Sequence, residues 1–516
     1  MSNTSSATPD SLADRVNRFV TWLFRDYARN RPRGPKVFND ALLGNQHFSK
    51  HEVAVIDSPL LQRLKRIKQT GLVYQVYPSA THSRFEHSLG TATLAERCFH
   101  AIRERSSVES GKTLPADPDR IKGDLAHLRM AAILHDVGHG LCSHASEQIY
   151  ELLSDLQEFK KNAIYSRNSP GEILSYLIIT SETFRSWFDA NVVSACQAEL
   201  KLDVIGDLIL GRHNDPDRYF LAQIVSSPYD SDKLDYIARD SFYCGLALTV
   251  DLPRFYSMIS TAKEDGYTVL VLRSYVPLEQ ILFSKMTLFA SVYHHQKAKC
   301  LDSMLRATLQ HISENARECK IDVGGIEVSF ADPVEYLYLT DDAFFNQIVP
   351  PRDEFVSRMI QRFRQRDLFA RCLEVSRRTV TTKSWDKSYG RKTLLDLSDN
   401  LSSLGDVERK IHAALPDNVK RRCDRGEVLL SVPKRPNLKT DFARVQTSSR
   451  APIETIEKFF PVEQWTDSYA YNKWRSFVYA PRDCAAAVRD AAVKILSEEF
   501  KLEVDTKLSD EICHVV

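Results

Sequence analysis

The chain has 516 residues, more than one compact core usually holds, so we expect one large domain and a smaller lobe. Its 69 basic and 68 acidic residues give a formal net charge of +1, a balance that argues against a protein devoted to duplex nucleic acid. The ten cysteines are scattered and include no Cys-x-x-Cys pair, so they indicate neither a zinc ribbon nor a disulfide framework and favour reduced thiols in a cytoplasmic protein.

The N-terminal region predicts a tail followed by a short hairpin. Residues 1–12 are rich in Ser and Thr, and we expect a disordered tail rather than a signal peptide. Val37-Phe38 and Val53 to Ile56 are short apolar runs that predict the two strands of the hairpin. No apolar run approaches the roughly 20 residues of a membrane-spanning helix, so no membrane association is expected.

Helix signals then dominate. Ser58-Pro59 predicts a helix start with Ser58 as N-cap, and Gly71 is expected to close this helix. Ser83 to Glu86 has the Ser-x-x-Glu form of a capping box, which predicts a helix that runs toward His100. Leu128 to His135 predicts a buried helix that ends near Gly138.

The second half of the chain predicts fewer helices and more strands. Asp230 or Ser231 can cap a helix through Arg239, with Asp232 in its first turn. Tyr267 to Tyr275 predicts a strand, and the polar stretch from Thr379 to Asp406 predicts a linker or mobile loop. Two strands and an amphipathic helix are expected beyond it, at Val428 to Val432, Trp474 to Tyr479 and Ala485 to Phe500. We therefore expect a mainly α fold, with a helical core over residues 13–375 and a linker and C-terminal α+β lobe over residues 376–516.

Histidines and acids gather in the run from His135 to His144, which also contains Asp136 and His139. An imidazole beside a carboxylate suits a divalent metal, and further imidazoles can bind phosphate or move protons. Taken singly, each of these residues could be an ordinary polar residue at a helix end. With two more from other segments they form a candidate ligand set that leaves open positions for water and substrate: His87, His135, Asp136 and Asp232.

These residues lie in segments that resemble the HD-domain deoxynucleoside triphosphate (dNTP) triphosphohydrolases, a family that includes vertebrate SAM- and HD-domain enzymes and bacterial dGTP triphosphohydrolases. The resemblance is dense over residues 36–147 and 226–246, and its most specific runs are HSRFEHSLG at 82–90 and DSDKLDYIARD at 230–240. It implies an HD phosphohydrolase domain over residues 13–375. It also implies a divalent ion, which could be Mn, Fe, Mg, Zn or Co, and cleavage of dNTPs to deoxynucleoside and inorganic triphosphate.

The resemblance also implies residue roles. His144 and Glu147 share a helix face and match a catalytic His-Glu pair, and His139 matches a phosphate-contacting histidine, although a solvated helix pair is the competing reading of the first two. Two departures are visible: Asn168 stands where vertebrate relatives have a histidine, and Lys285 where they often have arginine. The implied substrate contacts are Arg84, Lys233 and Lys285 for phosphate, and Gln69, Tyr236, Asp240 and Tyr293 for sugar and base.

A second nucleotide site is a further expectation from the family. A dNTP or GTP bound there would activate the enzyme and drive assembly of a homo-oligomer, either a dimer or a tetramer. Asp57 could read a guanine edge, but Asp57-Ser58-Pro59 is also simply a good helix start. The matching positions are Lys36, Val37, Asn39, Asp57, Gln62 and Lys65.

Three functions compete on the sequence alone. The leading hypothesis is a dNTP triphosphohydrolase that controls dNTP pools, with antiviral defence as a possible consequence. The second is an HD phosphodiesterase or nuclease acting on cyclic nucleotides or single strands. The third is a non-catalytic nucleotide sensor or nucleic-acid-binding scaffold that uses basic clusters such as Lys420-Arg421-Arg422, although such runs are usually solvated helix faces.

Overall fold

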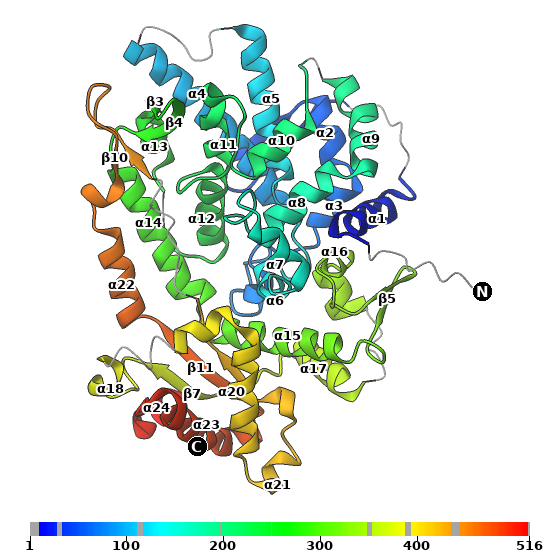
Figure 1. Cartoon of the computed structure of the whole chain (residues 1–516), viewed down its shortest axis with the longest axis vertical. Helices are drawn as coiled ribbons and strands as arrows, with labels where there is room; N and C mark the ends of the chain where they lie inside the picture. The colour runs from blue at the N-terminus through cyan, green and yellow to red at the C-terminus, as the bar shows by residue number, and fades with distance from the viewer. Residues whose placement is uncertain are drawn as a thin grey trace, which may run out of the picture.

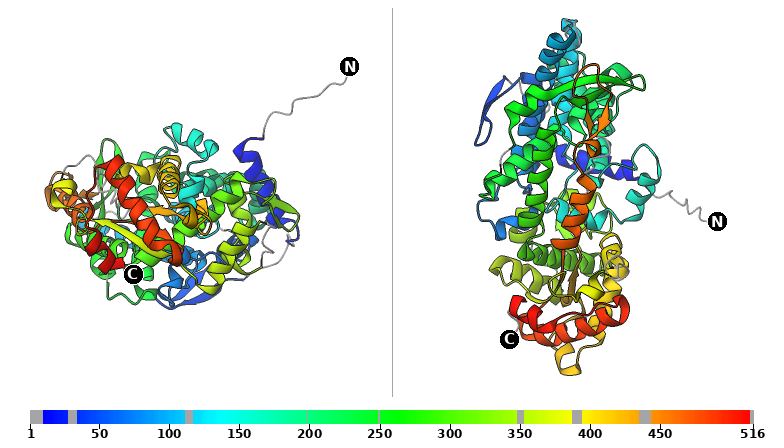
Figure 2. Two further views of the ribbon diagram at one scale, coloured as in Figure 1. Left: turned by 90° about the horizontal axis from the view of Figure 1, so that it is seen from below. Right: turned by 90° about the vertical axis from the view of Figure 1, so that its left-hand side faces the viewer.

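The computed structural model describes residues 10–27, 34–110, 117–196, 198–248, 250–347, 353–386, 394–434 and 443–513. The fold is mainly α-helical, as the sequence predicts. Figure 1 shows a large helical body in the upper part and a smaller lobe below it that holds the C-terminus, and Figure 2 shows that the molecule remains elongated when turned about the vertical axis. Within the described ranges, no helix is both long and apolar enough to cross a bilayer.

The helical body is built around α4 (Arg84–Ser110), which packs against α5 (Pro118–Leu134) and α12 (Ser231–Tyr243). Because the motif residues lie on these three helices or directly after them, the packing of the helices brings the candidate site together. The other helices of the body are α1 (Leu12–Phe24), α2 (Lys50–Ile56), α3 (Pro59–Leu64), α6 (His144–Tyr150), α7 (Ser154–Lys161), α8 (Pro170–Thr180), α9 (Glu182–Asn191), α10 (Leu202–Ile209), α11 (Tyr219–Val225), α13 (Leu252–Met258), α14 (Val276–Leu288), α15 (Gln296–Glu314), α16 (Glu335–Tyr338) and α17 (Glu354–Gln365).

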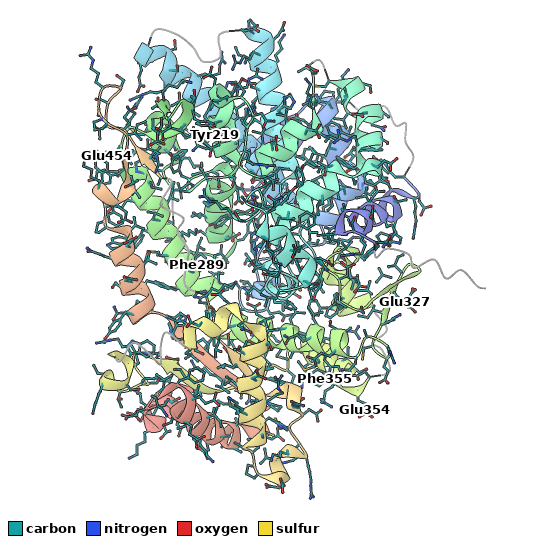
Figure 3. All side chains as sticks on the ribbon, in the orientation of Figure 1. Tyr219, Phe289, Glu327, Glu354, Phe355 and Glu454 are labelled. Atoms are coloured by element: carbon teal, nitrogen blue, oxygen red, sulfur yellow. The ribbon has the colours of Figure 1, made fainter. Side chains whose placement is uncertain are left out.

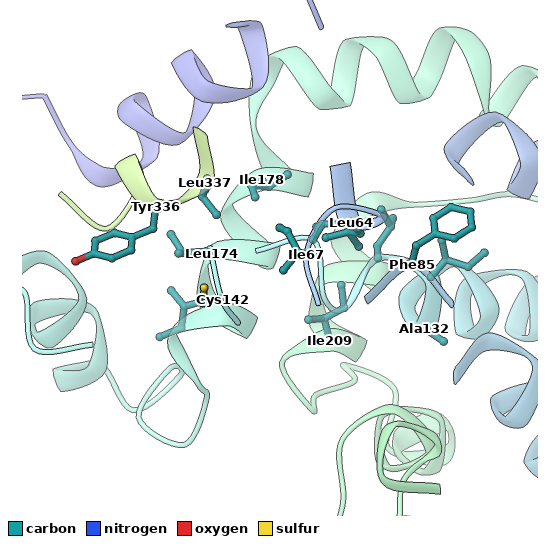
Figure 4. Close-up of a cluster of buried hydrophobic side chains, with 14 of the residues drawn as sticks. Leu64, Ile67, Phe85, Ala132, Cys142, Leu174, Ile178, Ile209, Tyr336 and Leu337 are labelled. Atoms are coloured by element: carbon teal, nitrogen blue, oxygen red, sulfur yellow. The ribbon is translucent and has the colours of Figure 1, made fainter. Parts of the chain in front are cut away.

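The core of the body joins elements that are distant in the chain. Figure 4 shows Leu64 of α3, Phe85 of α4, Leu174 of α8 and Leu337 of α16 within one cluster of buried side chains. Full burial of such a side chain contributes about 1.5–3 kcal/mol. Residues beyond position 330 therefore help to hold the helices that carry the candidate site.

The lobe has its own sheet and its own core. Strands β7 (Ala370–Ser376), β11 (Arg475–Ala480) and β8 (Leu429–Ser431) form an antiparallel sheet in the order β7-β11-β8. The two predicted strands and the predicted helix are confirmed here as β8, β11 and α23. The helices of the lobe are α18 (Thr382–Asp386), α20 (Leu401–Ala413), α21 (Asp417–Lys420), α23 (Ala485–Phe500) and α24 (Thr506–Cys513).

Part of the C-terminal region returns to the helical body. Strand β9 (Arg444–Val445) pairs in parallel with β4 (Tyr267–Leu272), which also pairs with β3 (Ile259–Glu264), and β10 (Glu454–Thr455) forms the edge beyond β9. The next helix, α22 (Val462–Asn472), lies along α14, where Trp465 meets Phe283. Two small hairpins complete the strands: β1 (Lys36–Asp40) with β2 (Gly44–Phe48), and β5 (Ile321–Val323) with β6 (Ile326–Val328).

Several expectations for the N-terminal region are wrong. Val53 to Ile56 is not a strand but the buried end of α2, whose capping box joins Ser49 and Glu52. A short apolar run cannot distinguish a buried helix from a strand, and β1 pairs with β2 instead. The helix that begins at Pro59 ends at Leu64, and Gly71 opens a 3-10 turn with a φ of +58°.

The tail and linker predictions also need correction. Leu12 is the first residue of α1 and is buried, although residues 1–9 lie outside the described part. Thr379 to Asp406 is not simply a linker, because Val380 pairs with Val504 and Trp385 of α18 is fully buried. Its polar composition hid these widely spaced apolar positions; residues 387–393 of the stretch lie outside the description.

Candidate functional site

The four predicted metal ligands converge in the structure. His87 comes from α4, His135 and Asp136 follow α5, and Asp232 lies in the first turn of α12. The Nε2 atom of His87 is 3.0 Å from an Asp232 oxygen and 3.7 Å from an Asp136 oxygen. The Nε2 atom of His135 is 3.8 Å from an Asp232 oxygen and 3.5 Å from an Asp136 oxygen. Metal-ligand bonds of about 2.0–2.2 Å fit among atoms at these separations.

The two histidines are oriented as metal ligands would be. Nδ1 of His87 lies 2.8 Å from Asp235 Oδ2, and Nδ1 of His135 lies 2.7 Å from the carbonyl oxygen of Ala132, so each Nδ1–H has an acceptor. The opposite atoms, both Nε2, are buried and face the carboxylates of Asp136 and Asp232. Outer partners that fix the tautomer and leave a lone pair for a cation are characteristic of metal-binding histidines.

Asp235 is the outer residue that the sequence prediction missed. Arg239 donates to its two oxygens from Nε at 2.8 Å and Nη2 at 2.9 Å. A Cβ atom at Gly90 would lie 2.0 Å from Asp235 Oδ1, so only glycine lets α4 approach α12 this closely. Asp235 and Arg239 are four residues apart on one helix face, and that spacing was the signal that could have identified them.

The cluster strongly favours positive charge. Burial opposes the charged form of His87, yet the carboxylates of Asp232, Asp235 and Asp136 raise its pKa to about 10. Burial would raise the pKa of Asp136, but Arg84 and the neighbouring histidines hold it well below its usual range. Carboxylates that stay ionised in a buried site stabilise a cation bound between them. The donor set therefore fits a divalent metal ion.

A second group, formed by His139, His144 and Glu147, lies beside the first. Nδ1 of His144 is 2.5 Å from Glu147 Oε2, as their spacing on α6 predicts, and the other Glu147 oxygen accepts from the Gly171 amide at 2.9 Å. Burial and Arg84 lower the pKa of His139 to about 3, so this ring is neutral near pH 7. The His144 side chain is 65% exposed, whereas Glu147 is buried.

The turn between His139 and His144 has a strained backbone. Cys142 and Ser143 adopt φ values of +55° and +53°, which is costly for residues other than glycine. Asp341 holds the turn by accepting the amide N–H of Cys142 at 2.7 Å and that of Lys68 at 2.8 Å. Ser143 accepts from Arg84 Nε at 2.8 Å. Asp341 lies nearly two hundred positions downstream, and no local motif marked it.

Of the predicted phosphate-binding cations, Arg84 and Lys285 are buried and Lys233 is partly buried. Arg84 donates to Asp136 at 2.6 Å, and its Nη2 has no hydrogen-bond partner within the described ranges. Lys233 donates to Asp230 at 2.6 Å, and Lys285 of α14 is buried. Asn168 replaces the family histidine and donates to Glu172 at 3.3 Å, while Glu172 caps α8 by accepting the Ser169 amide.

The predicted sugar residues meet at Asp240. Tyr293 donates to one Asp240 oxygen, and His82 Nε2 lies 2.7 Å from the other. Tyr236 lies one helical turn from Asp232 and one from Asp240 on the same face of α12, and burial raises the pKa of its phenol well above the usual range. Gln69 is buried close to this region, since its backbone N–H donates to the backbone carbonyl of His82. His82 was absent from the predicted set.

The proposed second-site residues are partly brought together. Lys36 donates to Asp57 at 2.6 Å, and Gln62 donates to the Ile56 carbonyl at 2.8 Å. The Lys65 ammonium lies 4.5 Å from the centre of the Phe85 ring, and Val37 is 54% exposed. Asn39 pairs with Asn45 across the hairpin. The hairpin and the start of α3 thus form one surface that carries charges of both signs.

Two family models match parts of this chain. A family model described as "HD domain" matches residues 84–235, and one described as "HD associated region" matches residues 257–508. The first range contains all four predicted ligands together with His139, His144 and Glu147. The second range contains Asp341, Lys285 and Tyr293.

Individual relatives are more distant. An uncharacterized protein of Methanocaldococcus jannaschii is 29% identical over 55% of this chain and 52% of its own length. The deoxynucleoside triphosphate triphosphohydrolase SAMHD1 homolog of Dictyostelium discoideum is 25% identical over 67% of this chain and 61% of its own, and human deoxynucleoside triphosphate triphosphohydrolase SAMHD1 is 25% identical over 65% and 54%. The chain therefore spans little more than half the length of these relatives. It contains an HD domain followed by an HD associated region, and it resembles the HD-domain dNTP triphosphohydrolases.

Proposed function

We propose that this protein hydrolyses dNTPs to deoxynucleoside and inorganic triphosphate. The observation that carries the proposal is the convergence of His87, His135, Asp136 and Asp232 beside the His144–Glu147 pair. A divalent ion held by the four ligands would supply a Lewis acid for the α-phosphate and would make water a nucleophile near neutral pH.

The protein's own groups divide the remaining work. His144 is exposed enough to reach a substrate, and Glu147, anchored on the Gly171 amide, orients its ring to protonate the leaving 5′-oxygen. His139 is a neutral hydrogen-bonding partner for phosphate at pH 7 because its pKa is low. Arg84, Lys233 and Lys285 offset the charge that develops on the phosphates.

Selection of deoxyribose belongs to the group around Asp240. In this proposal one Asp240 oxygen accepts the 3′-hydroxyl; the contacts of Tyr293 with Oδ2 and of His82 with Oδ1, which fix the carboxylate in place, support this role. Tyr293 packed against C2′ would leave no space for a 2′-hydroxyl, and Gln69 and Tyr236 would complete the sugar and base contacts. The expected kinetic signature is a much lower kcat/KM for ribonucleotides than for deoxyribonucleotides.

Regulation is part of the same proposal. We infer that a dNTP or GTP binds near Lys36, Asp57 and Gln62 and controls assembly into a dimer or tetramer in the cytoplasm, with control of dNTP pools and antiviral defence as consequences. The Lys36–Asp57 contact and the family resemblance support this site. Gel filtration with and without each dNTP and GTP tests it: no change in size and no activation would refute the regulatory part alone.

The activity is tested with a mixed substrate pool. The protein is incubated with Mn²⁺ or Mg²⁺ and with the four dNTPs, the four ribonucleotides, cyclic nucleotides or single-stranded DNA, and the products are identified. Release of intact inorganic triphosphate from dNTPs is the expected result. Cleavage of cyclic or single-stranded substrates instead would favour a phosphodiesterase or nuclease, and no turnover at all would favour a nucleotide sensor.

A further inference from the structure

A second cluster of metal-ligating side chains lies away from the HD centre, where α15, the β5–β6 hairpin and α17 meet. His311 lies in the last turn of α15, Cys319 shortly precedes β5, and Asp353 is the N-cap of α17. One ligand atom from each of the three lies within 4.8 Å of the others. Figure 3 shows this region at the lower right, where Glu354 and Phe355 mark the start of α17 and Glu327 marks β6.

The three donor atoms already face one another. His311 Nε2 lies 3.0 Å from Asp353 Oδ2, and the Cys319 thiol hydrogen-bonds to the Asp353 carboxylate. Tetrahedral Zn²⁺ with bonds of about 2.0–2.3 Å places its ligand atoms roughly 3–4 Å apart, which matches this arrangement. The His311 ring is held against Phe355 with centroids 4.5 Å apart, so its orientation is fixed.

We propose that His311, Cys319 and Asp353 bind a thiophilic divalent cation, for which Zn²⁺ is the expected ion, and that water completes its coordination. The donor set of one nitrogen, one sulfur and one oxygen distinguishes this site from the HD centre, whose donors are two nitrogens and two carboxylates. Thiolate selects Zn²⁺ or Co²⁺ over Mg²⁺ and Mn²⁺. The inference goes beyond the proposed hydrolase activity, because the site contains none of the residues assigned to substrate.

Binding at this site must release a proton. Burial and the Asp353 carboxylate raise the pKa of the Cys319 thiol to about 11, so the sulfur is protonated at neutral pH. The ion replaces that proton: the S–H bond breaks, a sulfur–metal bond forms, and H⁺ passes to solvent. Since the three ligands come from different elements, the bound ion would cross-link the end of α15 to the start of α17.

The test uses the full chain, stripped of metal with a chelator and titrated with Co²⁺. A cysteine thiolate bound to Co²⁺ gives a charge-transfer absorption band in the near ultraviolet, which the predicted HD ligand set, lacking sulfur, cannot produce. We expect the band in the wild type, loss of the band in Cys319→Ser, and weakening of it in His311→Ala. Zn²⁺ added afterwards should bleach the band, whereas Mn²⁺ should not.

Two control variants separate this proposal from the proposed activity. Asp136→Ala should keep the band although it disables the HD centre, and Cys196→Ser should keep it because Cys196 lies outside the cluster. Zn²⁺ should raise the unfolding temperature of Asp136→Ala but not that of the Asp136→Ala/Cys319→Ser double variant. Absence of the band in the wild type, or an unchanged band in a folded Cys319→Ser variant, would overturn the proposal whatever the hydrolase assay shows.

Discussion

The two halves of the candidate active site are built in opposite ways. On the ligand half, three of the four donors have a buried partner behind them: Asp235 and Arg239 support His87, the Ala132 carbonyl supports His135, and Arg84 supports Asp136. On the proton-transfer half, the His144 ring is mostly exposed, and Glu147 is its hydrogen-bonded partner. Groups that must hold a fixed geometry are buried and bonded, and the group that must exchange protons is left open to solvent.

This difference predicts which variants lose bound metal and which lose only catalytic rate. Substitutions on the ligand half should change metal content first and activity as a consequence. Substitutions on the proton-transfer half should leave metal content unchanged. If substitutions on the proton-transfer half also lowered the metal content, this division of the site into two halves would be wrong.

The largest effect is expected from Asp136→Ala. This change removes one ligand and leaves Arg84 buried without its carboxylate. Because a bound ion contributes several kcal/mol of transition-state stabilisation, hydrolysis should fall by roughly 10³-fold or more, together with metal content. Metal analysis and triphosphate release on the same preparation measure both. Asp203→Ala, an exposed carboxylate, is the control, and normal metal content in Asp136→Ala would contradict the ligand assignment.

The next effect is expected from His144→Ala. Loss of a general acid typically costs about 10²–10⁴-fold in rate, while the four ligands remain in place. We therefore expect a lower kcat, a nearly unchanged KM and full metal content. Glu147→Gln should show a smaller loss in the same direction, because the amide still anchors the ring without its charge. A rate unaffected by His144→Ala would mean that another group donates the proton.

Asp341→Asn should alter the pH dependence of stability. Burial raises the pKa of Asp341 from 3.8 to about 6, so the folded state holds its proton more tightly than the unfolded state does. Between pH 4 and 6 the wild type therefore loses about 3 kcal/mol of unfolding free energy from this group as pH rises, and the variant does not.

The asparagine also leaves one backbone N–H without an acceptor, which costs about 1–3 kcal/mol. The variant should thus be less stable than the wild type at pH 4, and because the wild type loses about 3 kcal/mol on the way to pH 6, the gap should close or reverse by pH 7. Denaturant unfolding at several pH values measures this gap, with Asp119→Asn at an exposed position as the control. A gap that widens toward neutral pH would contradict the assigned direction.

Features marked by residues close together in the sequence were predicted, and features that depend on residues far apart in the sequence were missed. Capping motifs at Ser83 and Asp230 are local, and both helix starts were predicted from them. The ligand set was predicted because its motifs are compact, although their convergence depends on three helices packing together. Asp341 could not be predicted, because its role is to accept N–H groups from segments far upstream. The hairpin partner was missed because β2 is mostly polar and exposed and has Phe48 as its one large apolar residue, whereas the apolar run from Val53 to Ile56 is buried in a helix.

The smallest and most discriminating effect is expected from Asp235→Asn, which does not touch a ligand position. The side chain keeps its size and one oxygen for His87, but the charge that pairs with Arg239 is lost. Removal of such an outer partner typically weakens metal binding by about 10–100-fold, so excess metal should restore most of the activity. Calorimetric titration with Mn²⁺ and activity at rising metal concentration measure the effect, with Asp203→Asn as the matched control. If added metal did not restore the rate, Asp235 would be needed for the reaction as well as for holding His87. The site could then not be divided into a half that only holds metal and a half that only transfers a proton.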